Sequence, residues 1–202
     1  MKKLLSALMA SSLLVAGSQV VVAQTYEKKH AKKVRPTYTY AGVKYTTQSL
    51  DDYEGNGSNK ECTQDGLNIN GSYDFGNQFF ARGSFTDVSG DEACGSSSLN
   101  VSGGYKVAWG ATSHVYGLLG FQNVSPDNGS GDSGLVLGGG IRGYVVQGIE
   151  AYFEVEHSTV FDGETSANFG GAYWFNKNFS VTGDIGIGAE QRSLAIGGRM
   201  SF

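Results

Sequence analysis

The feature that most constrains the fold of this chain is an alternation of apolar and polar residues that recurs in many separate segments. It is clearest over residues 67–75, 99–107, 149–156 and 179–188, the first of which reads LNINGSYDF. Because successive side chains of a β-strand point to opposite faces, these segments predict strands with one apolar and one polar face. Charged residues recur on the polar face, which favours a barrel with a polar interior over a soluble β-sandwich.

The glycine and aromatic content argues against helical and disordered alternatives. The chain contains 31 Gly, and each Gly weakens a helix by about 1 kcal/mol relative to Ala. A disordered chain would lack the 11 Tyr and 11 Phe that are spread through this sequence. We therefore expect an all-β fold.

Ten strands are predicted, joined by links of two alternating kinds. The strands cover residues 37–49, 64–75, 78–88, 97–107, 113–124, 134–146, 149–159, 165–175, 179–188 and 193–202. Links such as 51–63 are polar and mostly long, whereas links such as Gln147-Gly148 are tight. Long outer loops and short periplasmic turns are typical of membrane barrels. We predict a closed, antiparallel, up-and-down transmembrane β-barrel with both termini in the periplasm. Eight strands is the alternative if the first strand lies outside the wall or two strands merge.

The first 36 residues predict export and a short tail. Lys2 and Lys3 precede an apolar run over 4–16, and Val21-Val22-Ala23 suits a cleavage site, so residues 1–23 are expected to be a cleaved signal peptide. Residues 24–36 form a basic tail, expected to be disordered in the periplasm or to contact anionic lipid head groups. Residues 37–202 form the barrel. Export to this compartment excludes nucleic acid as a partner.

The final strand carries the most specific resemblance to a known family. Its outward alternation ends in a terminal phenylalanine, with the residues Leu194, Ile196, Met200 and Phe202. With this ending and the pattern above, the chain resembles the small outer-membrane β-barrel superfamily, of the OmpA transmembrane domain and OmpX type. The resemblance implies that these four residues are read by the barrel-assembly machinery, and that the partners are lipopolysaccharide and outer-membrane lipid. The chain departs from the family in having ten predicted strands rather than eight.

The polar face of the predicted strands carries cations and anions in equal number. They are Lys44, Arg82, Lys106, Arg142, Arg199, Asp74, Glu150, Glu154, Glu156 and Asp184. Charges inside a membrane are costly unless paired or hydrated, so we expect a lumenal network of ion pairs. It would serve as a packed polar core or as a constriction in a narrow water path. Inward Gly and Ala positions would loosen the lumen: Gly42, Gly104, Gly138, Gly140, Gly170 and Ala172.

The outer links are acidic and contain both cysteines. Carboxylates there would be solvated, or would bind divalent cations together with lipopolysaccharide phosphates. Residues 127–132 lack the spacing of an EF-hand loop, so no protein metal site and no cofactor are expected. Cys62 lies in the first predicted outer loop and Cys94 in the second, and an oxidising compartment favours a disulfide between them.

Little in the sequence supports an enzyme. His157-Ser158, near Asp162 and Glu164, is the one candidate cluster, and adjacent strand residues point to opposite faces. No Gly-x-Ser-x-Gly motif occurs. We expect a non-enzymatic outer-membrane barrel with an envelope structural role, or a narrow, weakly cation-selective porin. Surface adhesion through the loops is the alternative, and a hydrolase or lipid A-modifying enzyme ranks last.

Overall fold

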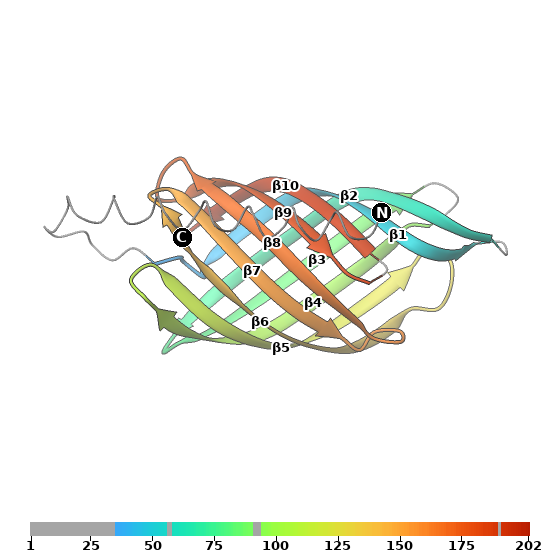
Figure 1. The fold of residues 1–202 in the computed structure, drawn as a ribbon, viewed down its shortest axis with the longest axis horizontal. Helices are drawn as coiled ribbons and strands as arrows, with labels where there is room; N and C mark the ends of the chain where they lie inside the picture. The colour runs from blue at the N-terminus through green and yellow to red at the C-terminus, as the bar shows by residue number, and fades with distance from the viewer. Residues whose placement is uncertain (1–34, 56–57, 91–93, 190) are drawn as a thin grey trace, which may run out of the picture. The chain divides into compact units, whose positions relative to one another are not determined.

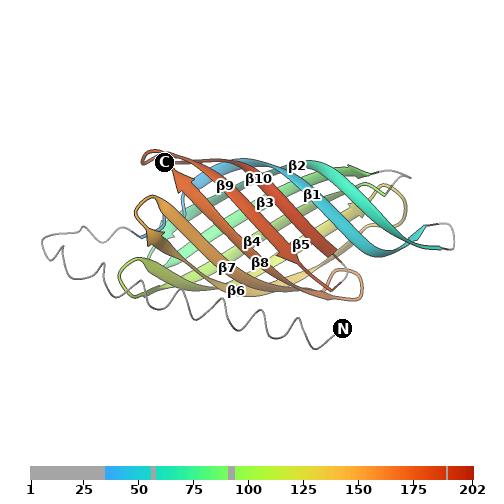
Figure 2. The ribbon, with the colours of Figure 1, turned by 45° about the horizontal axis from the view of Figure 1, so that its top comes forward.

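The structure is a computed structural model that describes residues 35–55, 58–90, 94–189 and 191–202, so the predicted signal peptide and most of the basic tail lie outside the described residues. Ten antiparallel strands close into one barrel in sequence order, with β10 paired to β1 (Figures 1 and 2). The strands are β1 (Tyr40–Gly55), β2 (Ser58–Gly76), β3 (Phe79–Gly90), β4 (Ser96–Trp109), β5 (Ser113–Pro126), β6 (Asp132–Val146), β7 (Ile149–Ser158), β8 (Glu164–Trp174), β9 (Phe179–Ile187) and β10 (Gln191–Ser201). The predicted ten-strand barrel is confirmed, and the eight-strand alternative is wrong.

Closure depends on the pairing of the first strand with the last. The β1–β10 ladder runs from Tyr40 opposite Ser201 to Leu50 opposite Gln191. The backbone groups of both edge strands are therefore paired, as lipid requires of any spanning sheet. The start of β1 and the end of β10 lie at the end of the barrel that carries the β2–β3, β4–β5, β6–β7 and β8–β9 turns, which we call the turn end. The opposite end is called the loop end.

The barrel wall is apolar on its outer face and polar on its inner face. Seven wall residues predicted to face outward are 37–57% exposed: Leu67, Ile69, Val101, Phe153, Val155, Ile185 and Ile187. The most deeply buried side chains include Gln64, Glu150 and Thr182, which reverses the usual distribution in soluble proteins. Outward-facing aromatic pairs lie near the turn end, such as Phe79 and Tyr105, whose ring centroids are 5.1 Å apart. In the described part of the chain, no helix is long and apolar enough to cross a membrane.

The first predicted outer loop is instead a continuation of two strands. β1 and β2 pair beyond the rest of the wall, through Tyr53 with Lys60 and Gly55 with Ser58, after a register shift between Leu50 and Tyr53. Polar residues break the alternation here, so the alternation predicted an end of the first strand and a start of the second that leave out the paired residues of this hairpin. The sequence signal that was missed is Asn56-Gly57, the residue pair most typical of a tight hairpin turn.

The predicted disulfide between Cys62 and Cys94 is present, with a Cα–Cα distance of 6.6 Å. Cys62 lies on β2 and not in a loop, because β2 begins at Ser58. At the loop end the β2–β3 ladder stops where Gln64 pairs with Gly90, and Cys62 lies two residues beyond this pair toward the loop end. The bridge thus continues the connection between β2 and the β3–β4 link beyond the last ladder pair.

Candidate functional site

The structure places all ten predicted charged residues in the lumen and joins them in ion pairs. The pairs are Lys44–Asp184 (2.5 Å), Arg82–Glu154 (2.7 Å), Arg82–Glu156, Lys106–Asp74, Arg142–Glu150 (2.6 Å) and Arg199–Glu150 (3.0 Å). Five cations and five anions therefore balance. Pairing lowers the cost of holding these charges away from bulk water.

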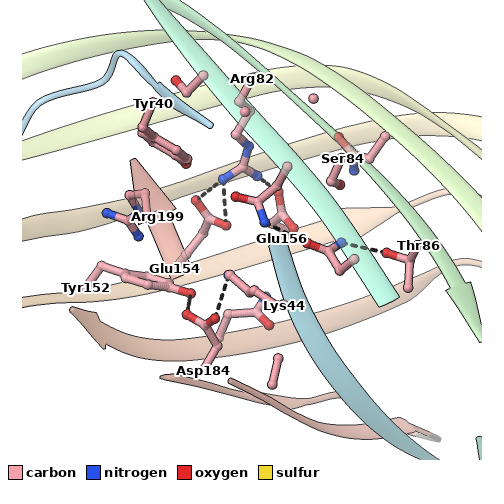
Figure 3. A pocket seen from close by; sticks show the side chains of 18 of the residues that line it. Tyr40, Lys44, Arg82, Ser84, Thr86, Tyr152, Glu154, Glu156, Asp184 and Arg199 are labelled. Carbon is pink, nitrogen blue, oxygen red and sulfur yellow. Dashed lines mark hydrogen bonds and ion pairs between the residues drawn. The ribbon is translucent and has the colours of Figure 1, made fainter. Parts of the chain in front are cut away.

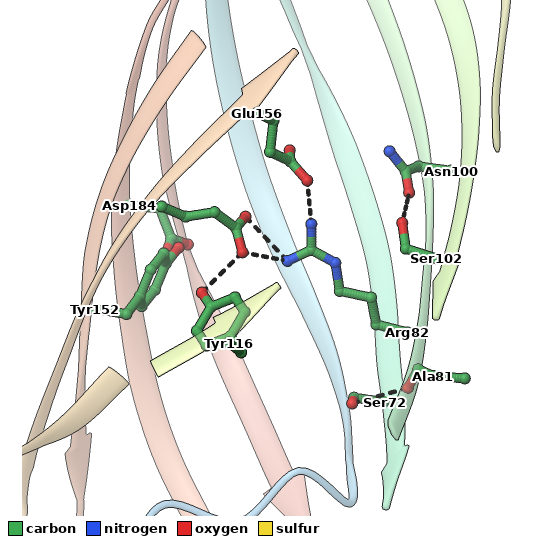
Figure 4. A network of polar contacts seen from close by, with 10 residues as sticks. Ser72, Ala81, Arg82, Asn100, Ser102, Tyr116, Tyr152, Glu156 and Asp184 are labelled. Carbon is green, nitrogen blue, oxygen red and sulfur yellow. Dashed lines mark hydrogen bonds and ion pairs between the residues drawn. The ribbon is translucent and has the colours of Figure 1, made fainter. Parts of the chain in front are cut away.

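The central cluster is built around Arg82, whose guanidinium bonds Glu154 (Figure 3) and Glu156 (Figure 4). Arg82 lies on β3 and both carboxylates on β7, four steps around the ten-stranded wall. The side chain therefore reaches across the lumen. Tyr116 on β5 donates its hydroxyl to Glu154 Oε2 at 2.7 Å, which fixes the carboxylate from a third strand.

A second pair lies beside this cluster. Lys44 on β1 contacts Asp184 on β9, and the Tyr152 hydroxyl donates to the same carboxylate (Figure 3). Together the two clusters give the middle of the lumen two cations and three carboxylates.

A cluster of Arg142, Arg199 and Glu150 at the turn end has more cations than carboxylates. Glu150 is 1% exposed, and its Oε1 accepts from both Arg142 and Arg199. Trp174 donates Nε1 to the second oxygen at 3.3 Å. The Arg199 guanidinium lies 4.5 Å from the centre of the Tyr40 ring, a cation–π contact that favours a charge held away from water.

An aromatic cluster also occupies the lumen, and the charge pattern did not predict it. Tyr38, Phe80, Tyr116 and Leu118 are all buried and pack together. The sequence signal is that inward aromatic residues lie directly opposite inward glycines on the next strand. The pairs are Phe80 with Gly104, Tyr116 with Gly140 and Tyr152 with Gly170. For these three glycines the expectation of a loosened lumen is wrong, because a Cβ at each would meet the facing aromatic side chain.

The remaining space forms two adjoining polar cavities. One, of about 280 Å³, is lined by charged residues of the central cluster, by amides such as Asn70, and by hydroxyls such as Ser84 and Thr86 (Figure 3). The other, of about 150 Å³, reaches toward the loop end at Glu164 and Gln191. Both are lined by Asn100, Glu156, Asn168 and Ser193, so the polar lining is continuous from the central cluster toward the loop end.

The candidate catalytic residues do not converge. His157 is exposed on the outer face and contacts Thr165 at 2.9 Å, whereas Ser158 donates to Gln122 at 2.8 Å. His114 is buried at the turn end against the Tyr38 ring. The described residues contain no group of three or more His, Cys, Asp or Glu side chains that could hold a metal ion.

The predicted assembly residues lie at the end of β10 and face outward. Leu194, Ile196 and Phe202 are 60–70% exposed, and Met200 is 37% exposed. The structure thus places them on the outer face of the wall, and their recognition by the assembly machinery stays a prediction.

Comparisons with known proteins identify the fold. No model of a protein family matches the sequence, and comparison with curated proteins also finds no match. An outer membrane channel from Pseudomonas putida F1 aligns at a TM-score of 0.51 with 13% identity, covering 87% of this chain and 100% of the channel. The β domain of the Bordetella autotransporter BrkA aligns at 0.52 with 10% identity, covering 82% and 100%. At these identities the likeness is one of fold: the chain has the architecture of outer-membrane β-barrels.

Proposed function

We propose that the protein is an integral outer-membrane β-barrel that works as a narrow channel for ions and other small polar solutes. The observation that carries the proposal is the lumen, where a closed wall surrounds a polar cavity of about 280 Å³ adjoining a second of about 150 Å³. A barrel of purely structural role needs no such space, because side chains can fill a small barrel completely.

In this proposal the turn end faces the periplasm and the loop end faces the outside, the usual orientation of such barrels. Carboxylates dominate the side chains that the structure describes at the loop end: Asp65, Asp87, Asp127, Asp132, Asp162 and Glu164, against Arg192. An acidic rim raises the local concentration of cations, so we propose a weak cation preference. The same carboxylates would bind divalent cations bridged to lipopolysaccharide phosphates.

Single-channel recording of the refolded protein in planar bilayers tests the proposal. We expect openings of low conductance and a reversal potential, in a salt gradient, that favours cations. Asp127→Asn with Asp162→Asn should reduce this preference, whereas Lys177→Gln at the turn end should leave it unchanged. A complete absence of openings would contradict the channel and favour an envelope structural role, and anion preference would contradict the rim argument.

A second candidate function, surface adhesion, is favoured by the projecting β1–β2 hairpin. Its strands pair with each other beyond Leu50, the last β1 residue that pairs with β10. Among the described residues no further strand pairs with its edges, which could therefore accept a partner strand. Deleting residues 53–60 should abolish adhesion of cells that display the barrel and spare conductance. Unchanged adhesion would remove this candidate.

A further inference from the structure

The residues before the first strand cross the turn end of the barrel. Thr39 is fixed beside β1, where it accepts hydrogen bonds from Phe202 N at 3.4 Å and Asp74 N at 3.1 Å. Arg35, at the other end of this segment, donates from Nη2 to Gly110 O at 3.2 Å in the β4–β5 turn. Since β2 and β3 lie between β1 and β4 in the wall, residues 35–39 span from one side of the opening to another. We call this segment the strap.

Tyr38 fills the lumen below the strap. Its side chain is 2% exposed although Tyr38 precedes β1 and takes no part in the wall. Its ring contacts side chains from four consecutive strands, β3 to β6: Phe80 (4.5 Å), Lys106 (4.5 Å), His114 (5.6 Å), Tyr116 (6.2 Å) and Arg142 (5.0 Å). Tyr38 also lines the larger cavity, so this ring is part of the boundary between the polar cavity and the turn end.

The attachment of the strap is suited to release. The Tyr38 hydroxyl is buried and has no hydrogen-bond partner among the described residues, so withdrawing the ring breaks no hydrogen bond of that group. Among the described residues, Arg35 at the far end is held to Gly110 by one exposed hydrogen bond. The wall itself is a closed ladder of ten strands, and opening it would break many backbone hydrogen bonds. Moving the strap therefore gives up the ring contacts of Tyr38 and a few hydrogen bonds, whereas opening the wall would break a whole ladder.

We infer that the strap is a gate: Tyr38 closes the turn end of the lumen at rest, and the channel conducts when the strap swings away and carries the ring with it. This inference rests on the proposed channel function. Such a gate predicts a specific change in the single-channel recordings. Because Tyr38 is absent from the path in the open state, its removal should change how long the channel is open and leave the current through an open channel unaltered.

The experiment compares five proteins in planar bilayers under identical salt and voltage: wild type, Tyr38→Ala, Tyr38→Phe, Arg35→Gln and Tyr45→Ala. Native-like migration on unheated gels and β-type circular dichroism establish that each has folded. Tyr38→Ala should raise the fraction of time open several-fold at the wild-type amplitude. Arg35→Gln, which removes the far anchor and keeps the ring, should raise it less. Tyr38→Phe keeps the ring and Tyr45→Ala alters an outward-facing tyrosine, so both should match wild type.

Three outcomes would overturn the gate. A larger amplitude for Tyr38→Ala with unchanged open time means that Tyr38 is a fixed part of the path and does not move. Wild-type behaviour of both Tyr38→Ala and Arg35→Gln, in a protein that conducts, means that the strap controls nothing. An absence of openings in every protein, Tyr38→Ala included, overturns the channel itself, and is distinguished from a failed gate because a failed gate leaves the wild type conducting.

Discussion

Arg82 on β3 and Glu154 on β7 form an ion pair across the lumen, with Arg82 Nη1 2.9 Å from one carboxylate oxygen and 2.7 Å from the other. The two strands are four steps apart in the ring of ten. Ladder hydrogen bonds join only neighbouring strands, whereas this contact joins two distant parts of the wall. It therefore braces the barrel and, at the same time, narrows the path through it.

Removing the cation of this brace should destabilise the barrel. Arg82→Gln leaves Glu154 and Glu156 close together on β7 without their shared partner. Because Arg82 is 24% exposed, we expect a loss at or below the about 3–5 kcal/mol that breaking a fully buried pair costs. Urea unfolding in lipid vesicles, followed by circular dichroism, measures the change. Arg82→Gln combined with Glu154→Gln should recover part of the loss, and Lys177→Gln, in an exposed turn, serves as the control. An unfolding midpoint equal to wild type for Arg82→Gln would show that the pair contributes nothing to stability.

Two adjacent glycines on β4 should respond differently to the same substitution. A Cβ at Gly104 would collide with the Phe80 ring, whereas a Cβ at Gly103 would meet nothing closer than Leu119 O at 4.0 Å. Phe80 is 3% exposed and packs on Tyr38 at 4.5 Å, so the ring has little room to move. Gly104→Ala should cost about 1–3 kcal/mol, the usual cost of overpacking a core, and Gly103→Ala should be close to neutral in the same unfolding assay. Equal effects of the two substitutions on stability would show that the Phe80 ring can move aside.

The wall of the barrel was predictable from the sequence because one physical rule sets it. The period of two fixes which face each side chain takes once strand identity is known. For this reason Lys44 and Asp184 could be assigned to the lumen from their positions in the alternation alone. Most turn and loop positions follow from the breaks in the same pattern, but the β1–β2 hairpin does not, because polar residues interrupt the alternation before the strands end.

Partners within the lumen were not predictable in this way. The alternation places Arg82 and Glu154 in the lumen. It does not predict which cation contacts which anion, since that depends on barrel closure and on the stagger between strands. The position of Tyr38 was missed for a different reason. It precedes the first strand, so no alternation describes it, and its burial results from packing against residues of four distant strands.

The two faces of the wall should differ sharply in their tolerance of charge and polarity. Val101 is 53% exposed on the outer face, and the adjacent Asn100 faces the cavity. Val101→Arg should cost about 2–4 kcal/mol in a lipid bilayer, since an arginine would enter hydrocarbon. Asn100→Ser keeps a polar group in a polar cavity and should cost far less. Chemical unfolding of both variants in vesicles compares them, and a smaller cost for Val101→Arg would contradict the assignment of the outer face to lipid.

The end of β10 should govern assembly in the cell more than stability of the finished barrel. Phe202 is 70% exposed and follows the last strand residue, Ser201. Its side chain therefore makes little contact that a folded barrel could lose. We expect deletion of Phe202 to lower the amount of folded protein in the outer membrane while the refolded variant unfolds near the wild-type urea concentration. Equal amounts in the membrane would contradict a role of Phe202 in the assembly signal.

The disulfide between Cys62 and Cys94 should stabilise the loop end of the barrel. Both cysteines are buried, and their sequence separation is 32 residues. Closing a loop of this length contributes about 3–4 kcal/mol by restricting the unfolded chain. The double variant Cys62→Ser with Cys94→Ser should therefore unfold at a lower urea concentration than wild type. Reductant should lower the stability of wild type and leave that of the double variant unchanged. Intact-mass analysis after alkylation gives the direct check: wild type should take up two labels only after reduction, and labelling without reductant would contradict the bridge.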